Sequence, residues 1–368
     1  MMERFRRGQR KIAILGGGRW ARAIAVALNE LLPGEATISM HSLGNAEGLR
    51  NWAQKTGAGR VEVADQWPRY DDAGRPEAVI VANAARSHFP ATVAALLAGA
   101  PTLVEKPFAL TAVEAGLLVE MAGKLDVPLC AGHVFRFARY VQVFADDIAR
   151  SSSVKRINFT WSDPATEIRH GEHKHYDASI SVIHDVFPHI LSLLRTLTVD
   201  PIRFNSVTIE RGGARVRLDL QAGEFPCTAV LERNALKRFR MIQVETTECS
   251  RELDFTSEPG FIRSGDHEKT GDPEWDRAPS PLQSMLKSFL AVAAAGKCDD
   301  TRLSPLLGLE ACRIMDLAVH AYRTELAKWM NARLEQQIDE DLRYALTEFV
   351  FSSNISMSAN GPVFLEHR

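Results

Sequence analysis

The sequence predicts an α/β protein with two domains: an N-terminal doubly wound parallel sheet and a C-terminal α+β domain with a large, mostly antiparallel sheet. In the first third of the chain, short apolar runs alternate with segments whose apolar residues recur at helical spacing. Parallel strands need such crossovers, so this alternation indicates a sheet covered on both faces. After residue 150, the segments favour β-branched or alternating residues between turn residues, which is typical of antiparallel strands.

The composition is that of a folded protein and excludes several classes of function. Apolar residues make up 45% of the 368 residues and charged residues 24%, close to the average for globular proteins. The balance of 44 Lys and Arg against 46 Asp and Glu argues against a surface built for a polyanion, so we expect no nucleic-acid partner. The longest apolar runs are too short to cross a bilayer and the N-terminus lacks an apolar signal core, which predicts a cytoplasmic protein without membrane contact. The five cysteines are scattered without a CxxC pair, which indicates reduced thiols and no metal site.

The N-terminal domain is expected to span residues 11–137. Residues 1–10 hold four arginines and little to bury, which predicts a flexible arm. A β-branched run at residues 11–15 predicts the first strand, and a glycine-rich turn leads from it to a helix over residues 21–32. The further strands are expected at residues 36–40, 77–83, 101–106 and 128–133, and the further helices at residues 46–57, 89–98 and 111–125.

The second domain is expected at residues 138–323 and a C-terminal extension at residues 324–368. Turn-bounded segments predict strands at residues 154–161, 201–211, 214–223, 226–234 and 239–247. Helices are expected at residues 138–150, 179–197, 281–295 and 306–321, with a long surface loop over residues 256–280. The extension has no predicted place in either domain, and exchange onto a partner subunit is one arrangement that would use it.

The glycine-rich turn indicates dinucleotide binding. Gly16, Gly18 and Ala21 fit the pattern G-x-G-x-x-G/A, with Arg19 and Trp20 inside it, between a strand and a helix. The first glycine allows a tight turn and the second lets the backbone approach a pyrophosphate at the helix N-terminus. We therefore predict a Rossmann-type domain, although a purely structural turn has the same pattern.

The end of the second strand favours NADP over NAD. NAD binders place an acidic residue about 20 positions after the turn to hold the ribose hydroxyl groups. Here the segment reads Met40, His41, Ser42, and no carboxylate would repel a ribose phosphate. His41, Ser42 and a nearby cation, Arg19 or Arg22, could accommodate that phosphate.

Several motifs further along the chain resemble those of one enzyme family. His88 begins a helix, the triplet Glu105-Lys106-Pro107 ends a strand, and "GHVFRF" stands at residues 132–137. These motifs and their spacing resemble the Gfo/Idh/MocA oxidoreductases, the family of glucose-fructose oxidoreductase and inositol dehydrogenase. The resemblance covers residues 11–320 and is dense in the first domain and thin in the second. It implies an NAD(P) cofactor near Asn83 and His88.

Lys106 is the predicted catalytic lysine. The carboxyl ends of strands in a doubly wound sheet face the ligand crevice, so its ammonium group is expected beside the nicotinamide, where it can stabilise charge on a substrate oxygen. Glu105 would orient Lys106 or its loop, and Pro107 would make the loop rigid; in the family this proline often follows a cis peptide bond. The alternative is an exposed ion pair.

A second cluster, Asp185 and His189, lies within "ISVIHDVFPHILSLL". Positions four apart share a helix face, and the resemblance implies that both act in the substrate site. Pro188 predicts that the helix begins close to it. Ser192 replaces the last acid of the family motif, which weakens the case for a polyol substrate. A structural histidine is the alternative for His189.

Three further residues are predicted to contact the substrate: Arg136, Lys174 and Tyr176. His170, His173, His175 and His184 crowd the approach to this helix, but their spacing does not fit a metal site.

The predicted function is that of an NAD(P)-dependent dehydrogenase or reductase. It transfers a hydride between the nicotinamide and a CH–OH or C=O carbon of a sugar, nucleotide-sugar or cyclitol-like substrate, as the resemblance implies. An imine reductase on the same fold and a non-catalytic NADP-binding scaffold are the alternatives. A homodimer or homotetramer through the second-domain sheet is expected.

Overall fold

The structure is a computed structural model of the whole chain. It describes residues 10–56, 61–70, 75–150, 153–169, 172–174, 176–177, 179–334, 338–352, 355–358 and 361–364. At residues 169, 172–174, 351–352, 355–358 and 361–364 the backbone alone is described. The chain divides into two compact units: unit 1 comprises Met1–Phe137 and Ala278–Cys312, and unit 2 comprises Ala138–Arg277 and Arg313–Arg368.

Unit 1 contains a parallel sheet of six strands with the order β3-β2-β1-β4-β5-β6. The strands are β1 Arg10–Leu15, β2 Ala36–His41, β3 Val61–Ala64, β4 Ala78–Val81, β5 Thr102–Glu105 and β6 Leu129–Gly132. The strand order reverses between β1 and β4, and such a switch point is where open α/β sheets bind ligands. The doubly wound sheet expected from the sequence is confirmed. Strand β3 is an additional strand, which was not predicted because its apolar run is short and is interrupted by Glu62.

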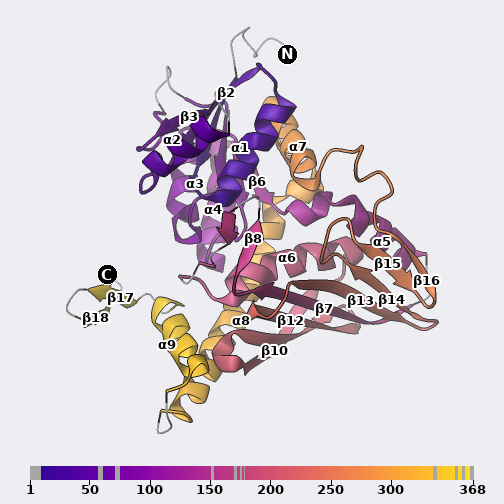
Figure 1. Cartoon of the computed structure of the whole chain (residues 1–368). Coiled ribbons are helices and arrows are strands. Elements are labelled where there is room, and N and C mark those ends of the chain that lie inside the picture. Colours follow the sequence, from indigo (N-terminus) through magenta and orange to yellow (C-terminus); the bar gives the residue numbers. More distant parts are fainter. Residues whose placement is uncertain are drawn as a thin grey trace. The chain divides into compact units, whose positions relative to one another are not determined.

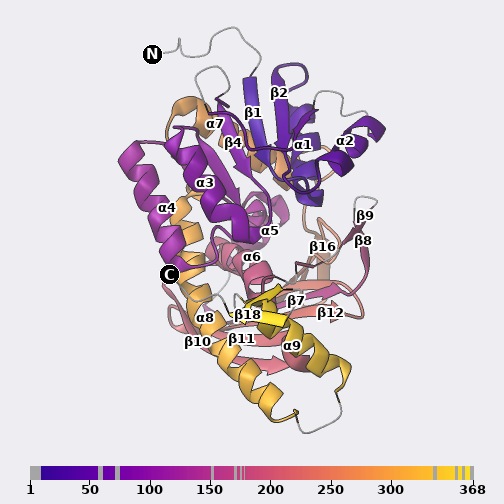
Figure 2. The same cartoon turned by 90° about the vertical axis from the view of Figure 1, so that its left-hand side faces the viewer.

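Helices complete unit 1. They are α1 Arg19–Leu31, α2 Ala46–Lys55, α3 His88–Leu97, α4 Ala112–Leu125 and α7 Pro281–Ala295, with the short helices η1 Ala85–Ser87, η2 Val134–Phe137 and η4 Thr301–Leu303. Helices α3 and α4 lie side by side (Figure 2). Helix α4 begins at a capping box, in which the Thr111 side chain accepts a hydrogen bond from the Glu114 N–H and the Glu114 side chain accepts one from the Thr111 N–H.

Residues 278–312 belong to unit 1 with the parallel sheet, although they were expected in the second domain. Helix α7 contacts α1 (Figure 1). Its Leu286 and Phe289 are fully buried in the apolar core of unit 1, and Gln283 donates a hydrogen bond to Glu30 at 2.7 Å. Helical periodicity reveals that α7 has an apolar face, but it does not say which core that face covers.

Unit 2 is built on a sheet of eight strands with the order β10-β11-β12-β7-β13-β14-β15-β16 (Figure 1). The strands are β7 Val154–Pro164, β10 Ile202–Glu210, β11 Arg215–Ala222, β12 Phe225–Ala235, β13 Phe239–Thr246, β14 Ser250–Asp254, β15 Phe261–Ser264 and β16 His267–Thr270. All neighbours are antiparallel except β7 and β12. The mostly antiparallel sheet is therefore confirmed. Strands β15 and β16 lie where a surface loop was expected. Their polar sequence does not indicate strands, and they are ordered by pairing with each other and with β14.

The remaining elements of unit 2 are helices and two short hairpins. The helices are α5 Arg139–Ala149, α6 Val182–Leu197, η3 Arg211–Gly213 and α9 Glu340–Ser352, and the hairpins pair β8 Glu167–Arg169 with β9 Glu172–Lys174 and β17 Ile355–Ser358 with β18 Gly361–Phe364. Helix α6 packs on β11 and β12, and α9 packs on η3. Helix α8, Pro305–Asn331, runs ten residues beyond its expected end at residue 321 and crosses the boundary between the units in the sequence.

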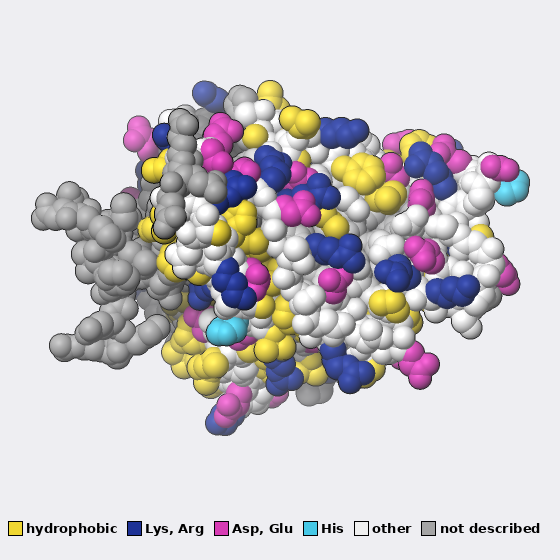
Figure 3. Space-filling model, turned by 90° about the horizontal axis from the view of Figure 1, so that it is seen from below, with side chains coloured by type: hydrophobic (Ala, Val, Ile, Leu, Met, Phe, Trp, Pro, Cys, Tyr) yellow, Lys and Arg dark blue, Asp and Glu magenta, His cyan; other side chains and the backbone are white. Residues whose placement is uncertain are grey.

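The surface charges and the hydropathy of the helices complete the description of the fold. Basic and acidic side chains are intermixed on the face seen in Figure 3, without a large area of one sign. None of the described helices is long and apolar enough to cross a membrane.

Candidate active site

The glycine turn brings the start of α1 against the end of β4. Gly16 has φ +143°, and a Cβ at this position would lie 2.4 Å from the Ala82 carbonyl oxygen. Gly18 is the N-cap of α1 and provides no side-chain hydrogen bond, and a Cβ built there would meet no heavy atom within 4 Å. The space beside Gly18 is therefore open, and the first backbone N–H groups of a helix have no partner within that helix, so the start of α1 is suited to binding a phosphate group.

Buried polar atoms without hydrogen-bond partners gather in the same unit. Among the described residues these include Arg19 Nη1, Asn83 Oδ1 and both ring nitrogens of His133. The three residues follow β1, β4 and β6 at their carboxyl ends. A buried polar atom without a partner is unfavourable by about 1–3 kcal/mol, and a ligand that both donates and accepts hydrogen bonds would remove this penalty. The residues present therefore fit a dinucleotide.

His41 and its neighbours at the end of β2 are engaged with the protein. His41 Nδ1 donates to the Gln66 carbonyl oxygen at 2.7 Å, and its Nε2 lies 3.0 Å from the Ser39 hydroxyl oxygen. Burial lowers the pKa of His41, against the effect of the bond to Gln66, so a neutral ring is favoured. The ring thus holds the loop after β2 and has no nitrogen left for a ribose phosphate.

The other residues predicted to accommodate the ribose phosphate, Ser42, Arg22 and Arg19, differ in their contacts. The Ser42 hydroxyl lies against Gly17, where an added Cβ would approach it to 2.6 Å. Arg22 Nε donates to the Gly17 carbonyl oxygen at 3.2 Å, and the Arg22 guanidinium lies 5.9 Å from the centre of the Trp52 ring. Arg22 therefore supports the turn, whereas Arg19 keeps a buried nitrogen without a partner among the described residues.

Glu105, Lys106 and Pro107 stand at the carboxyl end of β5. The peptide bond between Lys106 and Pro107 is cis. Glu105 is buried, and its Oε2 accepts a hydrogen bond from the Lys106 N–H at 3.3 Å. Burial raises the pKa of Glu105 to about 7, although a hydrogen bond from the Trp20 side chain and the charge of Lys106 oppose this. Glu105 thus holds the loop backbone, and the Lys106 side chain, which is half-buried, follows directly from it.

His88 connects this loop to the end of β4. Its Nδ1 lies 2.7 Å from the Pro107 carbonyl oxygen and its Nε2 lies 3.1 Å from the Asn83 carbonyl oxygen. The ring is 2% exposed, and burial lowers its pKa. His88 therefore fixes the loop that carries Lys106, a role that the sequence motif alone does not define.

Asp185 and His189 lie on α6 of unit 2, which begins at Val182 and includes Pro188 in its interior. The expectation that this helix begins close to the proline is therefore wrong. Ser181 provides the N-cap, with its hydroxyl oxygen accepting from the His184 N–H at 3.4 Å. The burial of the helix on the sheet and this cap outweigh the one backbone hydrogen bond that Pro188 removes.

His189 stacks on Trp161 of β7. The ring centres lie 5.2 Å apart and the planes differ by 9°. The Arg240 guanidinium lies over the same indole at 3.9 Å. Asp163 completes the group, because it accepts from the Trp161 indole N–H at 3.3 Å and from Arg240 at 3.2 Å. This buried set fixes the plane of the His189 ring.

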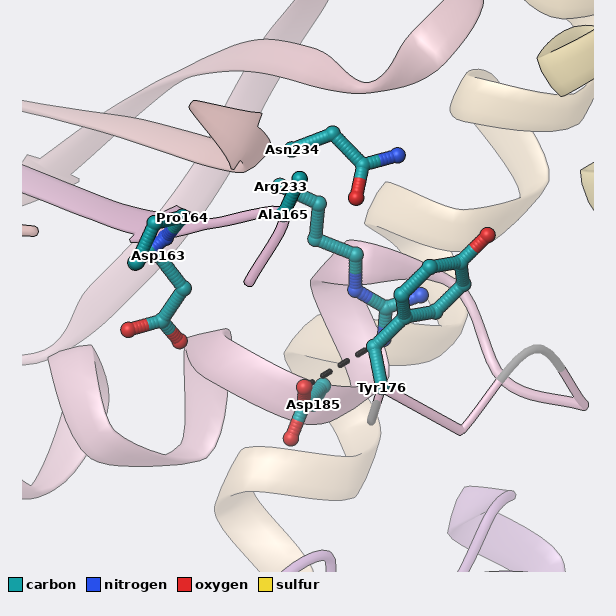
Figure 4. A pocket seen from close by; sticks show the side chains of 7 residues that line it. All are labelled: Asp163, Pro164, Ala165, Tyr176, Asp185, Arg233 and Asn234. Atoms are coloured by element: carbon teal, nitrogen blue, oxygen red, sulfur yellow. Dashed lines mark hydrogen bonds and ion pairs between the residues drawn. The ribbon is translucent and has the colours of Figure 1, made fainter. Parts of the chain in front are cut away.

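Asp185 faces a small hollow in unit 2. It is lined by Asp163, Pro164, Ala165, Tyr176, Asp185, Arg233 and Asn234 (Figure 4). Arg233 Nη2 donates to Asp185 Oδ2 at 3.4 Å, and the Arg233 guanidinium lies 5.1 Å from the centre of the Tyr176 ring. The hollow has a volume of about 10 Å³, which is room for one water molecule. Two carboxylates, a phenol and an amide here can exchange hydrogen bonds with hydroxyl groups.

The remaining predicted residues take different places. Arg136 lies in η2 of unit 1, where its charge and, above all, burial lower the pKa of His133 to about 3. The Lys174 side chain lies outside the described residues, as do His170 and His175. Ser192 is fully buried and donates to the His189 carbonyl oxygen at 2.8 Å, so it is part of the helix core.

Sequence reasoning missed Trp161, Arg233 and Arg240, although the sequence holds a signal for the two arginines. Residues two apart on a strand share a face. Arg233 follows the buried Ala229 and Leu231 on β12, and Arg240 precedes the buried Ile242 and Val244 on β13. An arginine in such a buried series requires a partner, and this pattern marks both residues.

Comparison with known proteins identifies the family of the N-terminal domain. The family model described as an oxidoreductase family with an NAD-binding Rossmann fold, Gfo/Idh/MocA, matches residues 10–133. The chain carries a Gfo/Idh/MocA NAD-binding domain. The resemblance of the motifs around Lys106 to this family is thereby confirmed, and residues 10–133 match its NAD-binding domain.

Individual relatives show how far this similarity reaches. Glucose-6-phosphate 3-dehydrogenase of Bacillus subtilis (strain 168) is 28% identical over 171 residues, which are 42% of this chain and 47% of the relative. The match thus spans about half the length of that enzyme.

Solved structures of similar fold cover most of this chain. UDP-N-acetylglucosamine 3-dehydrogenase GnnA from Acidithiobacillus ferrooxidans aligns with a TM-score of 0.67 and 19% identity over 86% of this chain and 98% of its own. KijD10, a 3-ketoreductase from Actinomadura kijaniata in complex with TDP-benzene and NADP, aligns with a TM-score of 0.69 and 14% identity over 85% and 98%. At these identities the similarity establishes the fold.

Proposed function

We propose that this protein is an NAD(P)-dependent dehydrogenase or ketoreductase that acts on a CH–OH or C=O carbon of a sugar or nucleotide sugar. The observation that carries the proposal is the combination of an open α1 N-terminus, Lys106 at the end of β5, and the polar group around Asp185 and His189. A bound nicotinamide would accept or donate the hydride. The names of glucose-6-phosphate 3-dehydrogenase and of UDP-N-acetylglucosamine 3-dehydrogenase support the substrate class, and the name of the 3-ketoreductase supports the reaction type.

In unit 1, the chain's own residues would hold the cofactor and present an ammonium group. The N–H groups at the start of α1 would bind the pyrophosphate, and Arg19 and Asn83 would satisfy their buried polar atoms on the dinucleotide. Lys106 would donate a hydrogen bond to the substrate oxygen and stabilise its developing negative charge. Glu105 and His88 would keep the Lys106 loop in place, because both hold its backbone.

In unit 2, Asp185 would accept hydrogen bonds from substrate hydroxyl groups and His189 would exchange a proton with the reacting hydroxyl. An imidazole ring can both accept and donate a proton, which makes it suitable for this exchange. The stack with Trp161 would limit rotation of the ring.

Kinetics on a defined panel test this function. Glucose 6-phosphate and UDP-N-acetylglucosamine are incubated with NAD+ or NADP+, and a cyclic imine with NADPH, and absorbance at the nicotinamide band is followed. Lys106→Ala should lower kcat by about 10²–10⁴-fold. Lys124→Ala, which removes an exposed lysine of α4 that pairs with Glu120, should leave the rate unchanged. Full turnover by Lys106→Ala on an active substrate would refute the mechanism, and reduction of the imine alone would replace the sugar assignment.

We further propose NADP as the preferred cofactor. No carboxylate occupies the end of β2, and Arg19 offers a buried guanidinium nitrogen without a partner among the described residues. NADPH should bind at least about tenfold more tightly than NADH, because a phosphate paired with arginine gains a charge-assisted hydrogen bond. Fluorescence titration of both cofactors measures this, and Arg19→Gln should reduce the difference; tighter binding of NADH would contradict the proposal.

A further inference from the structure

Arg233 is buried under the candidate substrate site and holds four oxygen atoms. Its Nη1 donates to the Ile180 carbonyl oxygen at 2.9 Å and to Glu348 Oε1 at 3.2 Å. Its Nη2 donates to the Ser181 carbonyl oxygen at 3.1 Å and to Asp185 Oδ2 at 3.4 Å. One guanidinium thus ties the strand β12 to the start of α6 and to the C-terminal helix α9.

Helix α9 supplies the second carboxylate of this group. The Glu348 side chain is 2% exposed, and its Oε1 also accepts a hydrogen bond from the Tyr344 hydroxyl at 2.9 Å. Tyr344 lies on the same helix one turn earlier, and its ring centre is 6.3 Å from that of Tyr176, which lines the hollow. The C-terminal extension therefore reaches the lining of the candidate site within unit 2.

The buried group contains more negative than positive side chains. Two carboxylates share one guanidinium, and a buried charge is stable only when it is paired. Burial raises the pKa of Glu348, and the negative charge of Asp185 raises it further, whereas Arg233 and the Tyr344 hydroxyl oppose this rise. The longer of the two ion pairs, at 3.4 Å, belongs to Asp185, whose side chain is 24% exposed and faces the hollow (Figure 4).

We propose that Glu348 is a positioning residue of the substrate site: it draws the Arg233 guanidinium toward α9 and so leaves Asp185 able to accept a hydrogen bond from a substrate hydroxyl group. This inference rests on the proposed function. Without the Glu348 charge, Asp185 is the one remaining carboxylate paired with Arg233 among the described residues, and the pair closes over the oxygen that a substrate would use. The C-terminal helix thus sets how strongly the site binds hydroxyl groups.

Steady-state kinetics with the active sugar of the panel above test this role. Glu348→Gln keeps the size of the side chain and its contact with Tyr344 but removes the charge, and it should raise KM for the sugar about tenfold while the Kd for NADPH stays the same. Glu348→Asp, which restores the charge, should recover at least part of the loss. Glu340→Gln, an exposed acid in the first turn of α9, is the matched control and should have no effect. The proposal is overturned if Glu348→Gln changes KM no more than this control, or if Glu348→Asp recovers nothing.

A second measurement is independent of turnover, and it separates failure of this proposal from failure of the proposed function. Urea unfolding of Asp185→Asn, Glu348→Gln and the double variant forms a thermodynamic cycle. Of the two carboxylates that pair with Arg233 in the described part of the chain, each single variant removes one and the double variant removes both. The double variant should therefore raise the unfolding equilibrium constant at least about tenfold beyond the product of the single effects. If both single variants fold and the double variant does not, the loss of stability again exceeds the product of the single effects, and the proposal is supported. Additive effects would overturn the proposal even if the sugar is turned over.

If Glu348→Gln does not fold, Tyr344→Phe takes its place. It removes a hydroxyl that donates to Glu348 and should raise KM for the sugar about threefold with unchanged Kd for NADPH. An unchanged KM would then count against the role of α9.

Discussion

Alanine at Gly16 and at Gly18 should separate the stability of unit 1 from its capacity to bind a dinucleotide. Gly16 has φ +143°, and an added Cβ would lie 2.4 Å from the Ala82 carbonyl oxygen and 2.9 Å from the Asn83 nitrogen. Gly18 has φ −73°, and an added Cβ there would meet no heavy atom within 4 Å. The same methyl group thus meets fixed backbone at one position and open space at the other.

The magnitudes follow from these contacts. A non-glycine residue in the backbone conformation of Gly16 costs about 1–3 kcal/mol, and overlap with backbone atoms that cannot rotate away adds about 1–3 kcal/mol. Gly16→Ala should therefore lower the free energy of unfolding by about 2–6 kcal/mol. Gly18→Ala should change it by less than about 1 kcal/mol, but its methyl group fills the space through which a pyrophosphate approaches the start of α1.

Urea unfolding without ligand and fluorescence titration with NADPH measure the two effects. The unfolding midpoint should fall for Gly16→Ala and stay constant for Gly18→Ala, while the Kd for NADPH should rise at least about tenfold for Gly18→Ala, a loss of about 1.4 kcal/mol. The reasoning is refuted if Gly18→Ala unfolds as easily as Gly16→Ala, or if it binds NADPH as tightly as the unchanged protein.

Three further predictions concern buried side chains. Because burial raises the pKa of Glu105 from 4.5 to about 7, the folded chain retains a proton that the unfolded chain releases in this range. The free energy of unfolding should then fall by about 3 kcal/mol as the pH rises from about 4.5 to 7. In a plot of the urea unfolding midpoint against pH, Glu105→Gln should reduce the slope over this range. An unchanged slope would contradict the assignment. Trp161→Phe keeps a ring beside His189 but removes the N–H that donates to Asp163, so urea unfolding should show a loss of about 1–2 kcal/mol, and a gain would speak against the bond. His88→Phe removes the ring nitrogens beside the Asn83 and Pro107 carbonyl oxygens and should lower kcat on an active sugar more than it lowers NADPH affinity, whereas equal losses would mean that His88 does not act through the Lys106 loop.

Much of unit 1 could be predicted because its signals are local. The glycine turn, the strand ends at His41 and Glu105, and the helix that begins at His88 are each defined within a few residues. In a doubly wound sheet the carboxyl ends of the strands meet at one edge, so placing each strand was enough to gather the candidate cofactor residues. The roles of those residues were harder to predict from the sequence. The shortest hydrogen bonds of the His41 and His88 rings join residues that are 25 and 19 positions apart in the chain.

The candidate substrate site of unit 2 was found only in part. Helical spacing put Asp185 and His189 on one face of a helix, but it did not place Pro188 inside that helix, because the Ser181 cap and the burial of α6 are tertiary features. The stack of His189 on Trp161 joins residues from a strand and a helix that are not adjacent in the sequence.

The sequence by itself determined the fold class, the glycine turn and the positions of Lys106, Asp185 and His189, because periodicity and spacing are properties of neighbouring residues. Only the tertiary structure decided that α7 packs in unit 1, that Arg233 lies beneath Asp185, and that Glu348, 115 residues further along the chain, shares this arginine. A buried charge must find a partner wherever the chain brings one, and that choice is made by the packing of whole helices and sheets.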